Sequence, residues 1–165
     1  MFYWAWSFDE DIGDWDVDNG VNFESMFAGA TSFDQDISDW EVGNGTRFGG
    51  MFQLATNFNQ DISEWDVSKG ISFWKMFDQA TSFDQDISNW DVTEGRVFLD
   101  MFREADLMIL NQGAPSTPNP YNYFSYKFKT KAVLFSAVES WISNKESATA
   151  TYGDIFLLYT SDAAD

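Results

Sequence analysis

The sequence predicts an α/β fold: a right-handed solenoid in which each 25-residue coil supplies one short strand and one short helix, and equivalent strands pair into a parallel sheet. Two observations predict it. A Met-Phe pair returns at constant spacing through residues 1–108, and within each interval a helix-like apolar pattern precedes a strand-like one. A unit this short cannot bury its own aromatic side chains, so neighbouring units must stack on one another.

The 25-residue period is visible at many positions, without insertion or deletion. The Met-Phe pair occurs at Met1-Phe2, Met26-Phe27, Met51-Phe52, Met76-Phe77 and Met101-Phe102. Alanine, phenylalanine, Asp-Ile, tryptophan and valine recur at fixed positions further along each unit. Self-similarity at one period is the signature of a repeat architecture, so we expect about four and a half repeats over residues 1–108.

The helix of each unit is predicted from the spacing of its apolar residues. Phe23, Met26, Phe27 and Ala30 recur at three- and four-residue intervals, which places them on one face of a helix. A glycine at one fixed position precedes this helix, where a left-handed backbone would permit a sharp turn. These glycines are Gly20, Gly45, Gly70 and Gly95.

The strand of each unit is predicted from alternation. Trp40 and Val42 flank Glu41, and Ile37 begins the same stretch, as is typical of a short, half-buried strand. Regular inward aromatic and aliphatic residues are what the core of stacked coils requires. The predicted core comprises Met26, Phe27, Phe33, Ile37, Trp40, Met51, Phe52, Phe58, Ile62, Trp65, Met76, Phe77, Phe83, Ile87 and Trp90.

The order of the recurring residues also carries a resemblance to a known family. The pattern M-F-x-x-A-x-x-F-[DN]-[EQ]-D-I-[GS]-x-W-[DE]-V resembles the short repeats of BspA-like surface proteins, over residues 1–108. The resemblance implies a leucine-rich-repeat-like solenoid in an extracellular or cell-surface protein with a role in adhesion. Gly45 and Phe48 stand where many members have Val and Met, which favours an algal or protist-type variant.

The array is expected to stop near residue 108, because Gln112 stands where isoleucine is due and no tryptophan follows. Residues 109–127 contain Gly113 and all three prolines, a composition typical of an exit loop or linker. Residues 128–155 resemble a helical leader of a second array, with Thr130 as N-cap. Residues 156–165 resemble a non-native tail, and Met1 lies on the repeat's own Met position. We therefore expect truncated ends, whose uncapped coils favour end-to-end self-association.

The composition excludes several functional classes. A formal net charge of −18 with nine Lys and Arg disfavours nucleic acid as a partner. The chain lacks an apolar run long enough to span a bilayer, so we expect no membrane insertion by this fragment. Because cysteine and histidine are absent, disulfides, thiolate metal sites and histidine-based acid–base chemistry are excluded.

Two acidic rows are the strongest candidate site in the sequence. Stacking would hold equivalent carboxylates about 5 Å apart, close enough to repel one another. Either the first row caps turns while the second is solvated, or neighbouring carboxylates share calcium, although no calcium-binding motif is present. The first row is Asp11, Asp36, Asp61 and Asp86, and the second is Asp16, Glu41, Asp66 and Asp91.

Enzymatic activity is not expected. Paired carboxylates can hydrolyse glycosides, but a catalytic pair breaks the symmetry of an array at one place, whereas these carboxylates recur in every coil. Ser-Lys chemistry is the one nucleophile–base arrangement that the composition permits. Ice binding would need several outward threonine rows, and Thr31, Thr56 and Thr81 form only one short row.

The predicted function is a non-catalytic repeat scaffold for surface adhesion or for binding an unknown protein or glycan. Many weak contacts along the array would supply the affinity. The alternative is a structural spacer or wall component with no discrete ligand, stiffened by calcium as its one conceivable cofactor. The candidate contact residues are the variable ones beside each tryptophan: Asp14, Asp39, Glu64 and Asn89.

Overall fold

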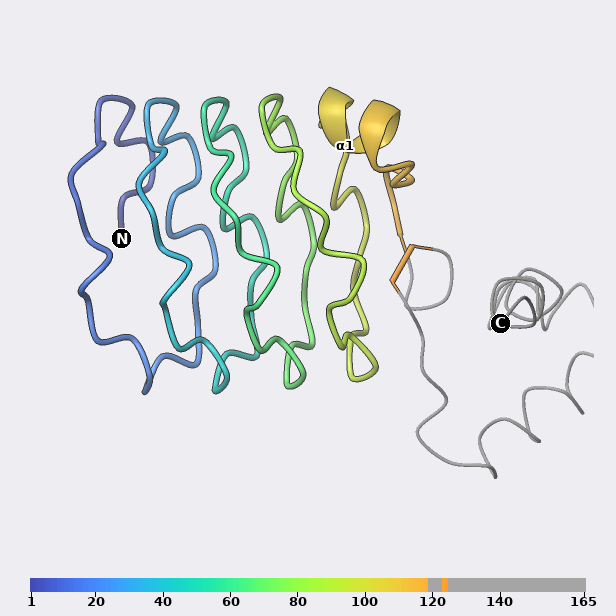
Figure 1. Cartoon of the computed structure of the whole chain (residues 1–165), viewed down its shortest axis with the longest axis horizontal. Helices are drawn as coiled ribbons and strands as arrows, with labels where there is room; N and C mark the ends of the chain where they lie inside the picture. The colour runs from blue at the N-terminus through green and yellow to red at the C-terminus, as the bar shows by residue number, and fades with distance from the viewer. Residues whose placement is uncertain (119–122, 125–165) are drawn as a thin grey trace, which may run out of the picture.

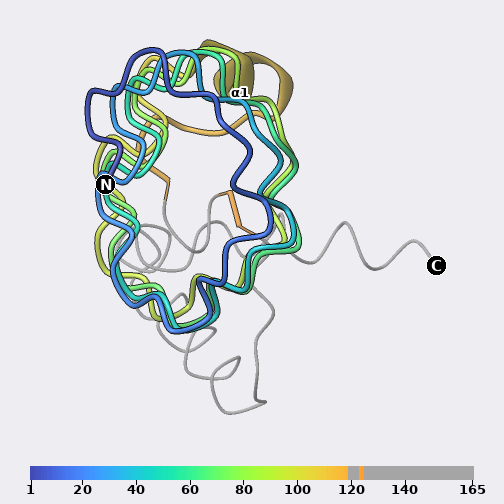
Figure 2. The same cartoon turned by 90° about the vertical axis from the view of Figure 1, so that its left-hand side faces the viewer.

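The computed structural model describes residues 1–118 and 123–124 as a stack of coils (Figure 1). Residues 1–105 wind through successive coils that stand side by side and overlie one another when viewed along the stack (Figure 2). The helix α1 (Asp106–Asn111) follows the last coil and is the one helix in the described part of the chain. The expected helical leader 128–155 and tail 156–165 lie outside the described residues.

Backbone hydrogen bonds hold neighbouring coils in a 25-residue register. The N–H of Phe27 donates to the C=O of Met51 at 2.9 Å, and Phe52 donates to Met76 at 2.9 Å. In residues 23–29 and their equivalents, the earlier coil supplies the N–H and the later coil supplies the C=O. Single-residue parallel bridges, which we call the bridge ladder, run through Asn22, Arg47, Ser72 and Val97.

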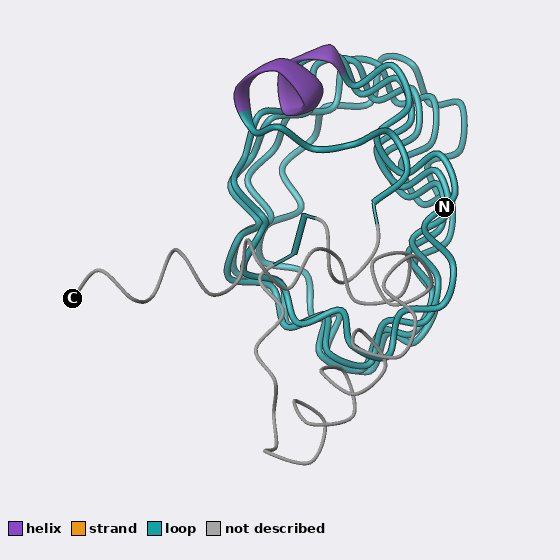
Figure 3. Cartoon of the chain, turned by 90° about the vertical axis from the view of Figure 1, so that its right-hand side faces the viewer, coloured by secondary structure: helices purple, strands orange, loops and turns teal. Residues whose placement is uncertain are grey.

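The segments expected as helices are built differently. Residues 23–30 are a series of turns, in which Ser25 and Gly29 have φ values of 55° and 75°. A residue in the left-handed region cannot continue a right-handed helix. The N–H groups that a helix would use internally are instead donated to the next coil, as for Ser25 to Gly49 at 2.9 Å. The expected helix is therefore replaced by turns in the described coils (Figure 3).

The segments expected as strands also differ from that expectation. In residues 37–42 the N–H of Trp40 donates to the C=O of Ile37 at 3.1 Å, and Val42 donates to Trp40 at 3.1 Å. These short-range bonds fold the segment into tight turns rather than an extended strand. Among residues 1–118, the strand-type pairing between coils consists of the single-residue bridges of the bridge ladder. This ladder lies in another part of each coil.

The fixed glycines have a different role from the one expected. Gly20, Gly45, Gly70 and Gly95 are not among the residues with left-handed φ values. Instead, a Cβ at Gly70 would lie 2.3 Å from Cζ of Phe73, and a Cβ at each of the other three would lie 2.3 or 2.4 Å from the equivalent phenylalanine three residues later. Glycine is needed because an aromatic ring occupies the space of its side chain. The left-handed positions lie in the neighbouring turns and include bulky residues such as Leu54 and Lys75.

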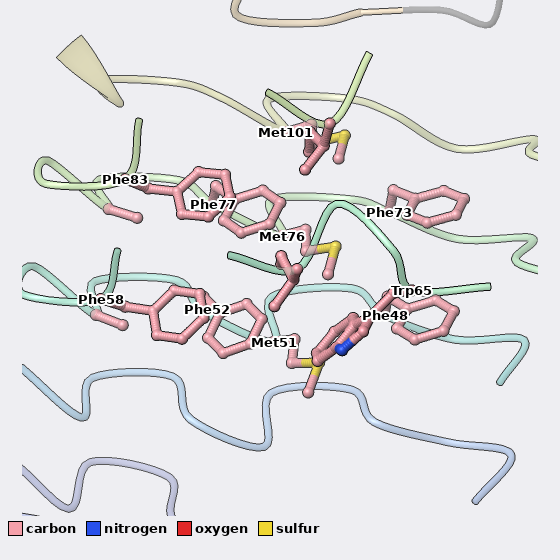
Figure 4. Close-up of a cluster of buried hydrophobic side chains, with 14 of the residues drawn as sticks. Phe48, Met51, Phe52, Phe58, Trp65, Phe73, Met76, Phe77, Phe83 and Met101 are labelled. Carbon is pink, nitrogen blue, oxygen red and sulfur yellow. The ribbon is translucent and has the colours of Figure 1, made fainter. Parts of the chain in front are cut away.

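Stacked phenylalanine rings fill the interior of the coils (Figure 4). The ring of Phe52 lies 5.7 Å from Phe27 and 5.6 Å from Phe77, centroid to centroid, and 4.0 Å from Phe58 in its own coil. Such offset stacks add to the free energy gained by burying apolar area. Every residue of the predicted core is buried except Met26, which is partly buried.

Each inner tryptophan links its coil to the preceding one. The indole Nε1–H of Trp40 donates to the C=O of Ile12 at 3.0 Å, and Trp65 donates to Ile37 at 3.1 Å. A buried indole N–H needs an acceptor, because leaving it without one costs about 1–3 kcal/mol. The tryptophans therefore set the register of the stack as well as filling it.

The segment expected as an exit linker covers the last coil. Residues 109–111 belong to α1, and Ala114 and Phe124 are buried in the core. The N–H of Phe102 donates to the C=O of Ser116 at 2.9 Å, as an inner phenylalanine donates to the next coil. Tyr123 packs edge-on against Phe102 with ring centroids 5.5 Å apart. The chain thus closes this end of the stack with non-repeating residues.

Candidate binding surface

The candidate contact residues form an exposed row, one in each coil. Asp14, Asp39, Glu64 and Asn89 are all exposed. Each lies just before a tryptophan whose N–H closes a turn, so the side chain projects from the tip of that turn. Because the coils repeat in register, the structure brings these side chains into one line along the stack.

The first acidic row caps turns. The Oδ1 atoms of Asp11, Asp36, Asp61 and Asp86 each accept a hydrogen bond at 3.0 Å from the backbone N–H two residues later. This is the turn geometry that aspartate favours, and it uses the carboxylates within their own coils. The hydrogen bonds match the turn-capping alternative expected from the sequence.

These hydrogen bonds shift the acidity of the row. The backbone N–H and hydroxyl groups of Ser38 and Ser63 donate to Asp36 and Asp61 and lower the pKa of both carboxyls. In the second row the hydroxyl and N–H of Ser68 lower the pKa of Asp66 in the same way. A depressed pKa means that the ionised form is better stabilised in the folded chain than in the unfolded chain.

The pH dependence of stability tests these shifts. Their contribution is present above the unfolded pKa of about 3.9 and is lost as the pH falls through the folded values. In Asp36→Asn/Asp61→Asn/Asp66→Asn the amide oxygen still accepts the turn hydrogen bond, but the ionisation is removed. We expect the wild type to exceed the variant in thermal midpoint by a few degrees at neutral pH, with the difference vanishing as the pH falls through the lowered folded pKa values.

A matched control removes the same charge elsewhere. Asp14→Asn/Asp39→Asn/Glu64→Gln alters carboxylates that accept no turn hydrogen bond in the described structure. Thermal unfolding from pH 2 to 7 should then show no comparable collapse of the difference from wild type. Equal pH profiles for the two triple variants would contradict the assignment.

The second acidic row is less regular than expected. Asp16, Asp66 and Asp91 accept backbone N–H bonds from two residues later at 3.2, 3.0 and 3.2 Å, so they cap turns rather than being merely solvated. Glu41 is exposed and accepts no comparable bond in the described coils. Hydrogen bonding and charge repulsion from Asp16 raise the pKa of Asp18.

A third polar row connects the coils and was not assigned from the sequence. The backbone N–H groups of Asp34, Asn59 and Asp84 each donate at 2.9 or 3.0 Å to the side-chain oxygen of the residue one coil earlier. The neighbouring glutamine amides donate to the same oxygens at 2.8 or 2.9 Å. The [DN]-[EQ] pair in the repeat was the signal for this row. The hydrogen bonds of this row join neighbouring coils. They leave its side chains with little capacity to hydrogen-bond a ligand.

One buried ion pair breaks the repeat symmetry. Asp78 is fully buried, and Arg103 donates to both its oxygens at 2.8 Å from Nε and Nη2. Gln53 donates to the same carboxylate at 3.0 Å from the preceding coil. Hydrogen bonds and charge from Asp78 raise the pKa of Arg103. The three residues share one repeat position, but Ala28 stands there in another coil, so the repeat pattern did not predict a buried carboxylate at this position.

The first coil bears a shallow hollow of about 310 Å³, lined by residues that include Asp16, Asn22 and Phe23. Across the described coils and cap, no three acidic side chains are placed to hold a metal ion. In the same part of the chain, no helix has the length and apolarity needed to cross a membrane.

A family model matches the chain. The family model described as "Mycoplasma protein of unknown function, DUF285" matches residues 1–69 and 46–141. The matched segments overlap within the coils and together cover most of the chain. No curated protein and no solved structure gives a significant match. The chain therefore belongs to the DUF285 family, whose function is unknown.

Proposed function

We propose that the chain is part of a right-handed, leucine-rich-repeat-like solenoid of the BspA-like type. It acts as a non-catalytic scaffold for adhesion at the cell surface and binds a protein or glycan partner. The 25-residue register of backbone hydrogen bonds supports the solenoid. Membership of a family whose matched segments span the coils supports the repeat character of the chain.

The observation that carries the proposal is the exposed row Asp14, Asp39, Glu64 and Asn89. The aspartates of the acidic rows on either side accept turn hydrogen bonds with their side-chain oxygens. The side chains of the exposed row make no such hydrogen bonds. Their identity varies, while the tryptophan that follows each one is constant and is buried at Trp40, Trp65 and Trp90. Contacts that are weak in one coil add up along a rigid row, because each bound contact raises the effective concentration of the next.

The chemistry of the side chains supports a non-catalytic role. The chain has neither histidine nor cysteine. Its turn-capping carboxylates repeat in near-identical settings, each accepting a backbone N–H at about 3 Å. Acid–base catalysis instead needs two groups whose environments push their pKa values apart.

The row's charge sets the chemistry of its ligands and provides the test. A line of carboxylates repels polyanions and attracts cationic chains, so we choose a chitosan oligomer and oligolysine as probes. Fluorescence anisotropy should show binding to wild type at low salt and at least a fivefold loss in Asp39→Lys/Glu64→Lys. The matched control is Glu10→Lys/Glu24→Lys, with the same change in net charge at exposed residues off the row.

The structural spacer remains the second candidate, because the coils are joined by their own side chains through the third polar row. If the chain is only a structural spacer, both double variants should bind the probes as wild type does, or both should lose binding equally because both have the same change in net charge. Either result would remove the row as a binding surface. Selective loss in Asp39→Lys/Glu64→Lys would support the scaffold.

A further inference from the structure

The contacts that repeat in every coil do not distinguish one neighbouring coil from another. The ring of Phe52 stacks on Phe27 at 5.7 Å and on Phe77 at 5.6 Å, so its two neighbours are nearly interchangeable. The indole N–H groups of the inner tryptophans donate to the preceding coil at 3.0–3.1 Å in each case. A stack held by such contacts alone would accept a wrong coil, for instance one from a second copy, almost as well as the right one.

One repeat position in the middle of the stack differs from coil to coil. Ala28, Gln53, Asp78 and Arg103 follow one another there at 25-residue intervals. Ala28 is 2% exposed, so an apolar side chain fits this position in the second coil. The polar side chains of the next three coils are therefore not required by the repeat. We call Gln53, Asp78 and Arg103 the polar triad.

The polar triad joins three consecutive coils through a single carboxylate. Asp78 has no exposed surface, and it accepts hydrogen bonds from Nε2 of Gln53 at 3.0 Å and from Nε and Nη2 of Arg103 at 2.8 Å. Lys75 adds a further positive charge, with Nζ 3.9 Å from Oδ2 of Asp78. The two hydrogen-bonded partners are thus supplied by the two coils that flank Asp78.

A different neighbour would leave the carboxylate of Asp78 without these partners. A coil with Ala28 at this position offers no donor, and a coil with a second Asp78 brings another negative charge to the same place. A buried carboxylate that lacks its partners is strongly unfavourable, because the desolvation of its charge is no longer compensated. The polar triad therefore penalises a wrong neighbour that the repeated contacts would tolerate.

Stability alone does not account for a buried ion pair of this kind. Replacing such a pair by apolar side chains of similar volume is often neutral or stabilising, because two charges need not be desolvated. The best-attested role of buried polar groups is to fix register, as a single buried asparagine does in coiled coils. A repeat array has a use for this role, since misassembly between copies is a characteristic failure of repeat proteins during folding.

We propose that the polar triad fixes the order of the coils. It selects the coils that carry Gln53 and Arg103 as the two neighbours of Asp78, and it disfavours out-of-order stacking between copies of the chain while they fold. An order-setting role and a stabilising role make different predictions. Removing the triad lowers the fidelity of refolding in the first case and the thermal midpoint in the second.

Asp78→Leu/Arg103→Met tests the proposal by replacing the ion pair with apolar side chains. We expect the thermal midpoint of the full chain to equal or exceed that of wild type. After rapid dilution from urea over a range of protein concentrations, light scattering on a sizing column should show a fraction of dimers and larger species about three times that of wild type or more. These species should keep the circular dichroism of wild type, because their coils still stack.

Two matched controls separate order from stability and from surface adhesion. Gln85 donates to the backbone and side-chain oxygens of Asn59 at 2.9 Å, a contact that recurs in other coils and so cannot specify their order. Gln85→Leu should lower the midpoint but refold to monomer as wild type does. Arg96→Met adds an exposed methionine outside the polar triad, and it should also refold as wild type does.

The proposal fails on any of three results. The first is an Asp78→Leu/Arg103→Met variant that refolds to monomer as completely as wild type at every concentration. The second is a Gln85→Leu or Arg96→Met variant that loses as much monomer, since the yield would then follow stability or surface apolarity. The third is a midpoint of the double variant clearly below that of wild type, which would assign the ion pair to stability rather than to order.

Discussion

Replacing Phe52 by alanine should lower the free energy of unfolding by about 3–5 kcal/mol. Phe52 is fully buried at the centre of the stack, with the rings of Phe27, Phe58 and Phe77 at 4.0–5.7 Å. Removing its ring loses the burial free energy of the side chain and leaves a cavity that the coils on either side cannot close without shifting their own rings.

Chemical denaturation followed by tryptophan fluorescence measures this loss. The matched control is Phe2→Ala, which removes the equivalent ring from the first coil. Phe2 is only partly buried and has a neighbouring coil on one side alone, so its truncation should cost clearly less. Because stability in a repeat stack is a sum of coil and interface terms, Phe52→Ala should also broaden the transition. Equal losses for the two variants would argue against a continuous ring stack.

Gly70→Ala should destabilise the chain by about 1–3 kcal/mol, even though it adds a single methyl group. The new Cβ would lie 2.3 Å from Cζ of Phe73 and 2.9 Å from the C=O of Val67. The ring cannot swing aside easily, because it is stacked between Phe48 at 5.6 Å and Phe98 at 5.3 Å. Any shift of the Phe73 ring to relieve the clash therefore also displaces the stacked rings of the adjoining coils.

Gly49→Ala is the control for this prediction, and thermal unfolding compares the two. A Cβ at Gly49 would meet its nearest atom at 3.4 Å, an ordinary contact, and Gly49 is not in the left-handed region. We expect its midpoint to stay close to that of wild type. Trimming the obstructing ring in Gly70→Ala/Phe73→Leu should make the double variant less unstable than the sum of its single changes. If the free-energy losses of the two single changes simply add, the clash between the new methyl group and the Phe73 ring is not the cause of the destabilisation.

The sequence was sufficient to predict which residues are buried, because burial in a stack follows the period. Phe33, Ile62 and Trp90 could be assigned to the core without knowing the local conformation. The local conformation was not predictable from the same pattern. Spacing of three and four residues suits a helix and also suits successive turns, and it does not reveal that the N–H groups bond to the next coil.

The parts that sequence reasoning missed are those that occur once. The ion pair of Asp78 and Arg103 has no counterpart in other coils, so the repeat pattern could not predict it. Tyr123 is a second case. It packs against Phe102 at 5.5 Å much as Trp90 packs against Phe77 at 6.4 Å, although it stands at no tryptophan position. Burial, with a smaller contribution from the charge of Asp86, raises its pKa to about 12. The residues that cover the last coil occupy the place of a further coil, although their sequence does not follow the repeat.

The bonds between coils in one set of turns share a direction, which gives those turns an electrical polarity; elsewhere the direction is reversed, as where the N–H of Thr46 donates to the C=O of Val21. In the turns at residues 23–29 and their equivalents, the donated N–H groups point toward the C-terminal end and the accepting C=O groups toward the N-terminal end. Aligned peptide dipoles add, as they do along an α-helix. The last coil ends in N–H groups, and the cap neutralises two of them through the C=O of Ser116 and the hydroxyl of Thr117. In these turns the C=O groups of the first coil point away from the second coil, so their partial negative charges add to the field of the first coil's carboxylates.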